Sequence, residues 1–285
     1  MLGGRPAIAD ARIVTVDADG VRRAKDKLAV EEPLEIRCGG PGQEPVRIAV
    51  TMRTPGHDFE LAAGFLFTEG LLDDPLDVES IGYCDDIETP EQQYNVVTVN
   101  LRRRPFDATA LARNFYATSS CGICGKAAID QIEVSCEPIA GDLTVSGATI
   151  LGLSAALRAR QRVFDRTGGL HATGLFAADG ELLETREDVG RHNAMDKLIG
   201  AQFLAGGTPL SDRIALVSGR ASFELVQKIA RAGVPVLCAV SAPSSLAVET
   251  ARRLGVTLVG FLRDERFNVY CGAERIEAGA VAHGA

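Results

Sequence analysis

The last third of the chain restricts the fold more than any other part. From residue 213 onward, near-continuous apolar runs alternate with amphipathic segments in the order strand, helix, strand, helix, strand. Strands that are apolar along their whole length are typical of parallel strands covered on both faces. The strands are predicted at "RIALVSGR", "VPVLCAVSAP" and "VTLVGFL". This order predicts two crossover connections in an open α/β sheet.

The first hundred residues have a different pattern. Alternating apolar and polar residues predict half-buried strands at 27–38, 46–52 and 94–102. One helix is expected at 57–72, with His57 and Asp58 as its capping pair. We therefore expect a smaller β-rich N-terminal part, residues 1–140, and an α/β part, residues 141–285.

The middle of the chain connects these two parts. Helices are expected at 107–118, at 154–169 with Ser154 as its cap and Gly168 as its stop, and at 191–207. A hairpin is expected over 170–188, with its turn at Ala178-Asp179-Gly180.

Composition narrows the class of protein. The chain has 285 residues, 46% of them hydrophobic, and a net charge of −8, which argues against a nucleic-acid binder. The N-terminus has no signal-peptide pattern, and no apolar run approaches the ~18–20 residues of a membrane span. We expect a cytoplasmic protein with no membrane contact. Its odd number of scattered cysteines, 7, fits reduced thiols.

Only two cysteines are closely spaced, Cys121 and Cys124 in "TSSCGICGK". A zinc site needs about four ligands, and no second C-x-x-C or histidine pair with finger spacing exists. The zinc deaminase pattern also fails, because no histidine is followed two positions later by Glu. A thioredoxin-type motif would need an early strand and a helix around it. Zinc is therefore not expected.

Sulfur carriage remains as one reading among several. A thiolate can accept a sulfur atom as a persulfide, and its pKa falls beside cations or at a helix N-terminus. Lys126 is close in sequence, and Gly122 and Gly125 allow backbone freedom beside the thiols. A second thiol two residues away can attack the inner sulfur and release the outer one. The alternative, two chemically idle thiols, is the minority interpretation.

Polar residues end each strand of the last third, where ligands of open α/β sheets gather. They are Ser218-Gly219-Arg220, the run that starts at Ser241, and Phe261-Leu262-Arg263. Helix N-termini and arginine forks suit phosphate or carboxylate. We interpret these ends as an anion or nucleotide pocket, although each serine alone could merely cap a helix.

A second polar cluster is "TREDVGRHNAMDK", residues 185–197. Arg191 and His192 lie near the first turn of a helix that Asp188 or Asn193 could cap. A functional cluster and a solvated helix start are equally compatible with this spacing. His171, close to glycines on both sides, is at least as compatible with a buried, satisfied histidine as with a ligand contact.

Several segments resemble the FdhD family of formate dehydrogenase accessory sulfurtransferases. They are "RTPGHDFELAAGFLFTEGLL", "SSCGICGK", "FDRTGGLHATGLF", "REDVGRHNAMDKLIG", "LVSGRASFELVQKIARAGVPVL", "SAPSSLAVETARRLGVTLVGF" and "RFNVY". The resemblance runs from about residue 25 to residue 275, and the order of the motifs is more specific than the C-x-x-C alone.

The resemblance implies a sulfurtransferase that accepts sulfur from a cysteine desulfurase. Cys121 would carry the persulfide with Cys124 as its partner. The sulfur would pass to the molybdenum or tungsten of a bis-molybdopterin guanine dinucleotide cofactor before insertion into the catalytic subunit of formate dehydrogenase. It also implies a homodimer and a cytidine-deaminase-like mixed sheet flanked by helices, without the zinc ligands.

The resemblance also implies that the guanine dinucleotide cofactor is the ligand of the strand-end pocket. The family's cofactor-binding segment corresponds to Phe261, Leu262, Arg263, Asp264, Glu265 and Arg266. The physical argument adds Ser218, Gly219, Arg220 and Ser241 as contacts, with His192 as a further candidate.

Two other classes stay open. A chaperone that only binds and delivers the molybdenum cofactor would need the pocket but not the thiols. A small metal-binding α/β protein could use Cys121, Cys124 and Cys136.

Overall fold

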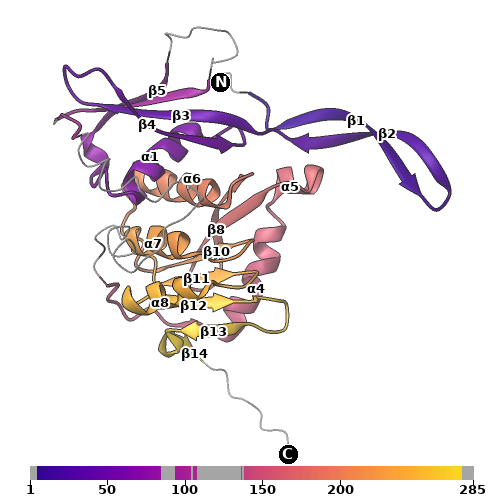
Figure 1. Ribbon diagram of the computed structural model, residues 1–285. Helices are drawn as coiled ribbons and strands as arrows, with labels where there is room; N and C mark the ends of the chain where they lie inside the picture. Colours follow the sequence, from indigo (N-terminus) through magenta and orange to yellow (C-terminus); the bar gives the residue numbers. More distant parts are fainter. Residues whose placement is uncertain (1–4, 85–93, 104, 108–135, 137, 278–285) are drawn as a thin grey trace, which may run out of the picture.

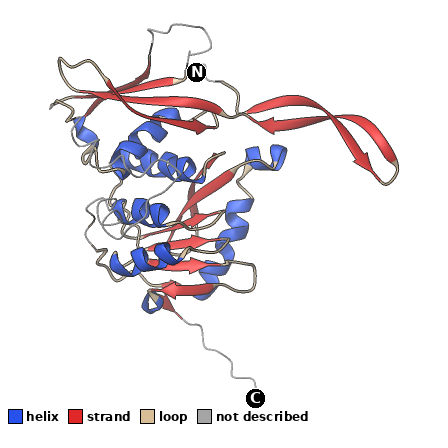
Figure 2. Cartoon of the chain, in the orientation of Figure 1, coloured by secondary structure: helices blue, strands red, loops and turns tan. Residues whose placement is uncertain are grey.

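The computed structural model describes residues 5–84, 94–103, 105–107, 136 and 138–277. Two sheets, each with helices packed on it, form the body, and a long two-stranded arm projects from it (Figure 1). In Figure 2 the helices lie between the two sheets and on both sides of the larger one.

The larger sheet has six strands in the order β13-β12-β11-β10-β8-β9. In chain order they are β8 (His171–Ala177), β9 (Leu182–Asp188), β10 (Arg213–Val217), β11 (Val236–Ala239), β12 (Thr257–Gly260) and β13 (Asn268–Cys271). The three central strands β10, β11 and β12 are parallel, and the remaining pairings are antiparallel. This mixed α/β sheet and its two crossovers confirm the prediction for the last third of the chain.

Helices cover both faces of this sheet (Figure 1). They are α4 (Gly147–Arg158), α6 (Arg191–Leu204), α7 (Phe223–Arg231) and α8 (Ser245–Arg253). Alternate strand residues divide into two cores: Ala215 and Leu237 join the core of α6, α7 and α8, whereas Ile214 and Val236 join that of α4. Burial on both faces explains why these strands are apolar throughout.

The smaller sheet has the order β4-β3-β6-β5. Its elements are β3 (Glu32–Gly39), β4 (Val46–Arg53), β5 (Val78–Tyr83), β6 (Val96–Leu101), the packed helix α1 (Asp58–Thr68) and the short helix η1 (Pro75–Asp77). Leu34 and Val99 of this sheet share one core with Leu225 of α7. The boundary between the two parts near residue 140 stays a prediction.

The arm is formed by β1 (Ile8–Asp17) and β2 (Gly20–Ala29), which pair only with each other among the described strands. Its base lies against the short helix α5 (Arg162–Thr167), where a Cβ on Gly169 would lie 3.4 Å from Ala29 Cβ. The far end of the arm extends away from the body (Figure 1). Three small elements complete the described chain: β7 (Val145–Ser146), η4 (Ala273–Arg275) and β14 (Ile276–Glu277).

Three local predictions are wrong. The segment 27–38 is not one strand, because the chain leaves the arm at Ala29 and enters β3 at Glu32. The single helix expected at 154–169 is two helices. The first, α4, starts earlier, where Ser146 Oγ accepts the Thr149 N–H at 3.0 Å, and ends at Arg158. The second, α5, ends just before Gly168. His57 precedes α1 but makes no side-chain cap.

Other local predictions are confirmed or lie outside the described residues. The β8–β9 hairpin turns at Gly180, whose φ of +91° requires glycine. Most of the predicted helix at 107–118, and all of the segment "TSSCGICGK" with Cys121 and Cys124, lie outside the described residues.

Candidate functional site

Backbone hydrogen bonds tie the ends of the central strands together. Ser241 N–H donates to Gly219 O at 3.2 Å, and Phe261 N–H donates to Ser241 O at 3.1 Å. Ser218 is fixed to β8 twice, since its N–H donates to Ala172 O and its Oγ accepts the Ala172 N–H, each at 2.9 Å. The structure therefore brings Ser218, Gly219, Ser241 and Phe261 to one edge of the sheet.

The segment after β12 forms a turn, closed by Arg263 N–H donating to Arg266 O at 2.9 Å. The Arg263 guanidinium folds back onto Leu262 O at 3.0 Å and onto Val240 O. Asp264 and Glu265 are exposed, whereas the Leu262 side chain is fully buried in the core. Leu262 can therefore offer only backbone atoms to a ligand.

Phe261 has an unusual backbone for a bulky residue, with a φ of +51°. A left-handed conformation costs a non-glycine residue roughly 1–2 kcal/mol. The Phe261 ring is nevertheless 39% exposed, so core packing does not compensate for this strain. Strain that the core does not explain is typical of functional segments.

A pocket of about 490 Å³ opens beside these strand ends. It is lined by Ser154, Leu157, Arg158, Gln161, Phe164, Gly168, Gly169, Leu170, His171, Ser218 and Val240. Arg158 lies 4.8 Å above the Phe164 ring, a cation–π arrangement. Polar strand ends predicted Ser218, but the lining from α4 and α5 was not predicted, because nothing local distinguishes those residues from an ordinary helix surface.

Positive and polar groups cluster around His171. Burial lowers the pKa of His171, and the positive charge of Arg191 and the nearby His192 lower it further. Arg191 Nε is buried without a hydrogen-bond partner in the described part of the chain. A Cβ on Gly219 would lie 3.3 Å from His171 Nδ1, so glycine lets the backbone and the imidazole approach closely. This surface is suited to an anionic ligand.

His192, in α6, contacts two residues at the start of the next helix, α7. Its Nε2 lies 2.8 Å from Glu224 Oε2 and 3.2 Å from Ser222 Oγ. The hydrogen bond from His192 lowers the pKa of Glu224. Arg220, at the start of the same connection, is exposed. His192 and Arg220 therefore flank the strand ends, one anchored and one extended toward solvent.

The charged run at 185–197 is largely structural. Lys197 Nζ lies 2.6 Å from Asp188 Oδ2 and donates to Thr54 O at 2.8 Å, and both charged side chains are at most 1% exposed. Asn193 Nδ2 donates to Met52 O at 2.7 Å and to Asp188 Oδ1 at 3.1 Å. The reading of this run as a solvated helix start is wrong for these residues.

A second buried ion pair was missed from the sequence. Arg53 forms a bidentate pair with Asp58, at 3.0 and 2.9 Å, with neither side chain more than 1% exposed. The signal was the segment "RTPGHD", in which the turn at Pro55-Gly56 brings an arginine back to the first residue of a helix.

The described cysteines do not form a metal site. Groups of three or more potential His, Cys, Asp or Glu ligands are absent from the part of the chain that the structure describes. Burial raises the pKa of Cys238 to about 12 and also raises that of Cys271. Neither thiol is suited to act as a nucleophile near neutral pH.

None of the helices in the described ranges is both long and apolar enough to span a lipid bilayer.

Fold and site together define a mixed α/β protein with a pocket beside the ends of its central strands, where Arg158, His171 and Ser218 lie among apolar side chains. The profile described as the FdhD/NarQ family matches residues 29–277, and the chain belongs to this family.

Curated relatives match over nearly the whole chain. A "Sulfur carrier protein FdhD" of Streptomyces coelicolor is 52% identical, covering 93% of this chain and 94% of the relative. One of Mycobacterium tuberculosis is 49% identical, covering 95% and 99%. One of Thermoplasma volcanium is 44% identical, covering 92% and 93%.

A solved structure has the same fold. The crystal structure of a protein from Desulfotalea psychrophila, described as a formate dehydrogenase accessory protein, superposes with a TM-score of 0.73 at 26% identity. The match covers 95% of this chain and 100% of that one.

Proposed function

We propose that this protein is a sulfur carrier, a sulfurtransferase, that serves the maturation of formate dehydrogenase. The observation that carries the proposal is its family membership, with relatives named as sulfur carriers at about half identity over almost their whole length. A neighbour in structure is described as a formate dehydrogenase accessory protein.

The proposed first step forms a persulfide on Cys121. The Cys121 thiolate attacks the outer sulfur of a persulfide on a cysteine desulfurase. The S–S bond of the donor breaks, and the donor cysteine leaves as a thiolate. Cys238 and Cys271 have raised pKa values, so neither of these two thiols competes with the C-x-x-C pair as a nucleophile.

The second step releases the sulfur. The Cys124 thiolate attacks the inner sulfur of the Cys121 persulfide, so that a Cys121–Cys124 disulfide forms and the outer sulfur leaves as sulfide. Sulfide becomes a ligand of the molybdenum or tungsten atom of the substrate. An external dithiol reductant must then reduce the disulfide before another cycle.

The substrate that we propose is bis-molybdopterin guanine dinucleotide, bound at the strand ends. Its phosphates suit a surface that combines Arg191, Arg220 and Arg263 with the N-termini of α7 and α8, which follow the strand ends. The pocket of about 490 Å³ beside Ser218 is in the size range of small-molecule sites. The sulfurated cofactor is then delivered to the catalytic subunit of formate dehydrogenase, and the carrier acts as a homodimer.

A loading experiment tests the proposal. Purified protein is incubated with a cysteine desulfurase and cysteine and analysed by intact mass spectrometry. We expect the mass of one additional sulfur atom, lost in Cys121→Ala and retained in the control Cys84→Ala, which changes a partly buried thiol of the smaller sheet. In Cys124→Ala, loading persists but sulfide release stops. Full formate dehydrogenase maturation by Cys121→Ala contradicts the carrier role.

A further inference from the structure

The β1–β2 arm is longer than its attachment requires. Ten residue pairs run from Ile8–Ala29 to Asp17–Gly20, and only the base lies against α5. Two-stranded hairpins are marginally stable in water unless something packs on them. Valines near the tip are exposed: Val14 by 59%, Val16 by 71% and Val21 by 74%.

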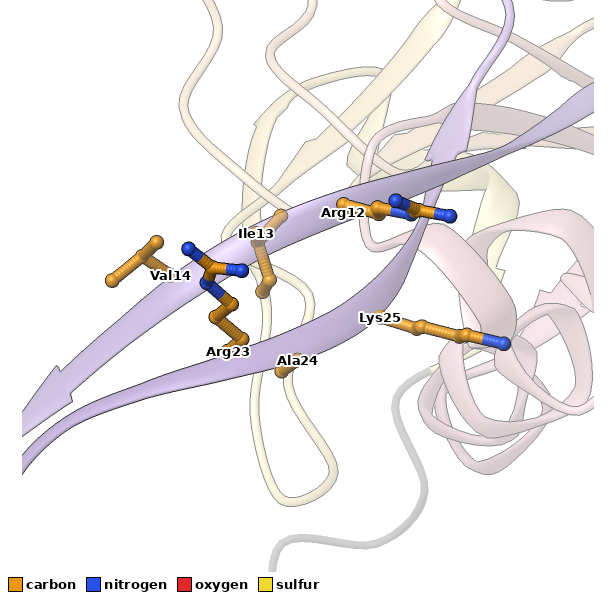
Figure 3. Close-up of a pocket in the computed structure, with 6 residues that line it drawn as sticks. All are labelled: Arg12, Ile13, Val14, Arg23, Ala24 and Lys25. Atoms are coloured by element: carbon orange, nitrogen blue, oxygen red, sulfur yellow. The ribbon is translucent and has the colours of Figure 1, made fainter.

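One face of the arm carries unpaired cations. Residues opposite each other in an antiparallel ladder point to the same side, which places Arg12 with Lys25 and Val14 with Arg23 on one face. Figure 3 shows Arg12 and Lys25 extending in the same direction from the two strands. Arg12, Arg23 and Lys25 take part in no ion pair within the described ranges.

Their neighbours on the arm behave differently. Lys27 pairs with Asp10 and Arg22 with Asp17, each at 3.4 Å. The arm therefore neutralises the cations near its base and its tip, and leaves a central basic patch formed by Arg12, Arg23 and Lys25.

This basic patch costs the arm stability. Like charges directly opposite each other, as at Arg12 and Lys25, destabilise an antiparallel pair. The patch also stands out in a chain whose net charge is −8. No carboxylate of the described ranges forms an ion pair with it, so no contact within these ranges explains the patch.

A groove lies at the basic patch. It has a volume of about 580 Å³ and is lined by Arg12, Ile13, Val14, Arg23, Ala24 and Lys25 (Figure 3). Arg12, Val14, Arg23 and Lys25 line it from one face of the arm, and Ile13 and Ala24 from the other. Both strands have an edge that pairs with no described strand.

We propose that the basic patch and the exposed valines dock an acidic polypeptide segment of another protein. Carboxylates complement Arg12, Arg23 and Lys25, and apolar side chains cover the valines. The free strand edges can add the segment as a further strand. A nucleic acid fits less well, because the arm has no aromatic side chain on which bases could stack.

The arm is attached to an element that contributes to the strand-end pocket. Its base packs on α5, and Phe164 of α5 together with Gly168 and Gly169 lines the strand-end pocket. The arm that would hold the protein thus rests on an element that also lines the pocket. The inference concerns protein docking alone and does not depend on the sulfur chemistry.

The test uses a fluorescein-labelled decapeptide in which Glu and Val alternate at every second position with Thr between them, so that a strand presents both on one face. The peptide is titrated with the full chain and followed by fluorescence anisotropy. We expect binding that weakens with added salt. The triple variant Arg12→Glu, Arg23→Glu, Lys25→Glu should weaken it by about tenfold or more, as expected for three exposed charge contacts. This variant keeps like charges opposite each other, so the electrostatic cost within the arm is preserved.

The matched control is Arg102→Glu, Arg103→Glu, Arg252→Glu, which changes the net charge equally at exposed sites outside the arm. It should bind the peptide like the wild type. The proposal is overturned if both triple variants bind alike, or if the same decapeptide with Lys in place of Glu, or a single-stranded DNA oligonucleotide, binds at least as tightly. It is also overturned if reversal on the arm alone converts a dimer to monomers, because a second copy would then be the occupant.

Discussion

Gly64 of α1 and Gly200 of α6 let the two helices cross with their backbones in direct contact. A Cβ on Gly64 would lie 1.9 Å from Asp196 O, and a Cβ on Gly200 would lie 1.9 Å from Glu60 O. These contacts are backbone to backbone, so no rotamer change could relieve them. The crossing joins the smaller sheet to the larger one.

Gly64→Ala or Gly200→Ala should therefore destabilise the fold by about 3 kcal/mol or more, at the upper end of the range for overpacked cores. Urea denaturation measures the change. The control is Gly152→Ala in α4, where a Cβ meets nothing within 4 Å. There we expect a gain of up to about 1 kcal/mol from helix propensity. Equal effects at Gly64 and Gly152 would refute the close crossing.

Removing one partner of the buried Asp188–Lys197 pair should be severe. Lys197→Met leaves Asp188 as an uncompensated buried charge, at a cost of about 3–5 kcal/mol. The exposed pair of Lys27 and Asp10 provides the comparison, since Lys27→Met should cost less than about 1 kcal/mol. A mild effect of Lys197→Met in thermal unfolding would mean that Asp188 is hydrated in the native protein.

The backbone of Phe261 predicts an unusual order of stabilities. Phe261→Gly removes the left-handed strain but also the buried part of the ring, so its stability should differ little from that of the wild type. Phe261→Val should lose about 1–2 kcal/mol, since a β-branched residue resists a positive φ. Denaturant midpoints give the order, and a Val variant more stable than the Gly variant would contradict the assigned backbone.

His171 should titrate below its ordinary pKa of 6.5, because burial and the charge of Arg191 favour the neutral imidazole. A lowered pKa means that the unfolded chain binds protons first as the pH falls. The stability that His171 contributes is then complete above pH 6.5 and decreases below it. NMR titration of the imidazole measures the midpoint, which Arg191→Met should raise. A midpoint at or above 6.5 in the wild type would show that the carboxylate of Asp188, which raises this pKa, outweighs burial and Arg191.

Sequence reasoning succeeded where local patterns determine the structure. The strands β10, β11 and β12 were predictable because strands buried on both faces are apolar throughout. Strand ends with serine, glycine and arginine then placed Ser218, Ser241 and Phe261 at one edge of the sheet, and backbone hydrogen bonds join them there.

The arm was missed because neither of its faces is buried, so its strands lack apolar periodicity. The turn "DADG" was the available signal, with Asp19 N–H donating to Asp17 Oδ1 at 3.0 Å and Gly20 at a φ of +125°. The buried pair of Asp188 and Lys197 could not be distinguished from a solvated one, because its burial depends on Thr54, which is distant in sequence.

The glycine crossing of α1 and α6 also limits how a ligand can enter. At Gly64 and Gly200 no side chain separates the two helices, and Phe67 of α1 stacks on Phe203 of α6 beside the crossing, so the helices cannot slide past each other without breaking these contacts. Domain closure about this crossing is therefore not available as a gate. Free and ligand-bound forms should superpose over both sheets as a single rigid frame, with any change on binding confined to the residues that line the pocket.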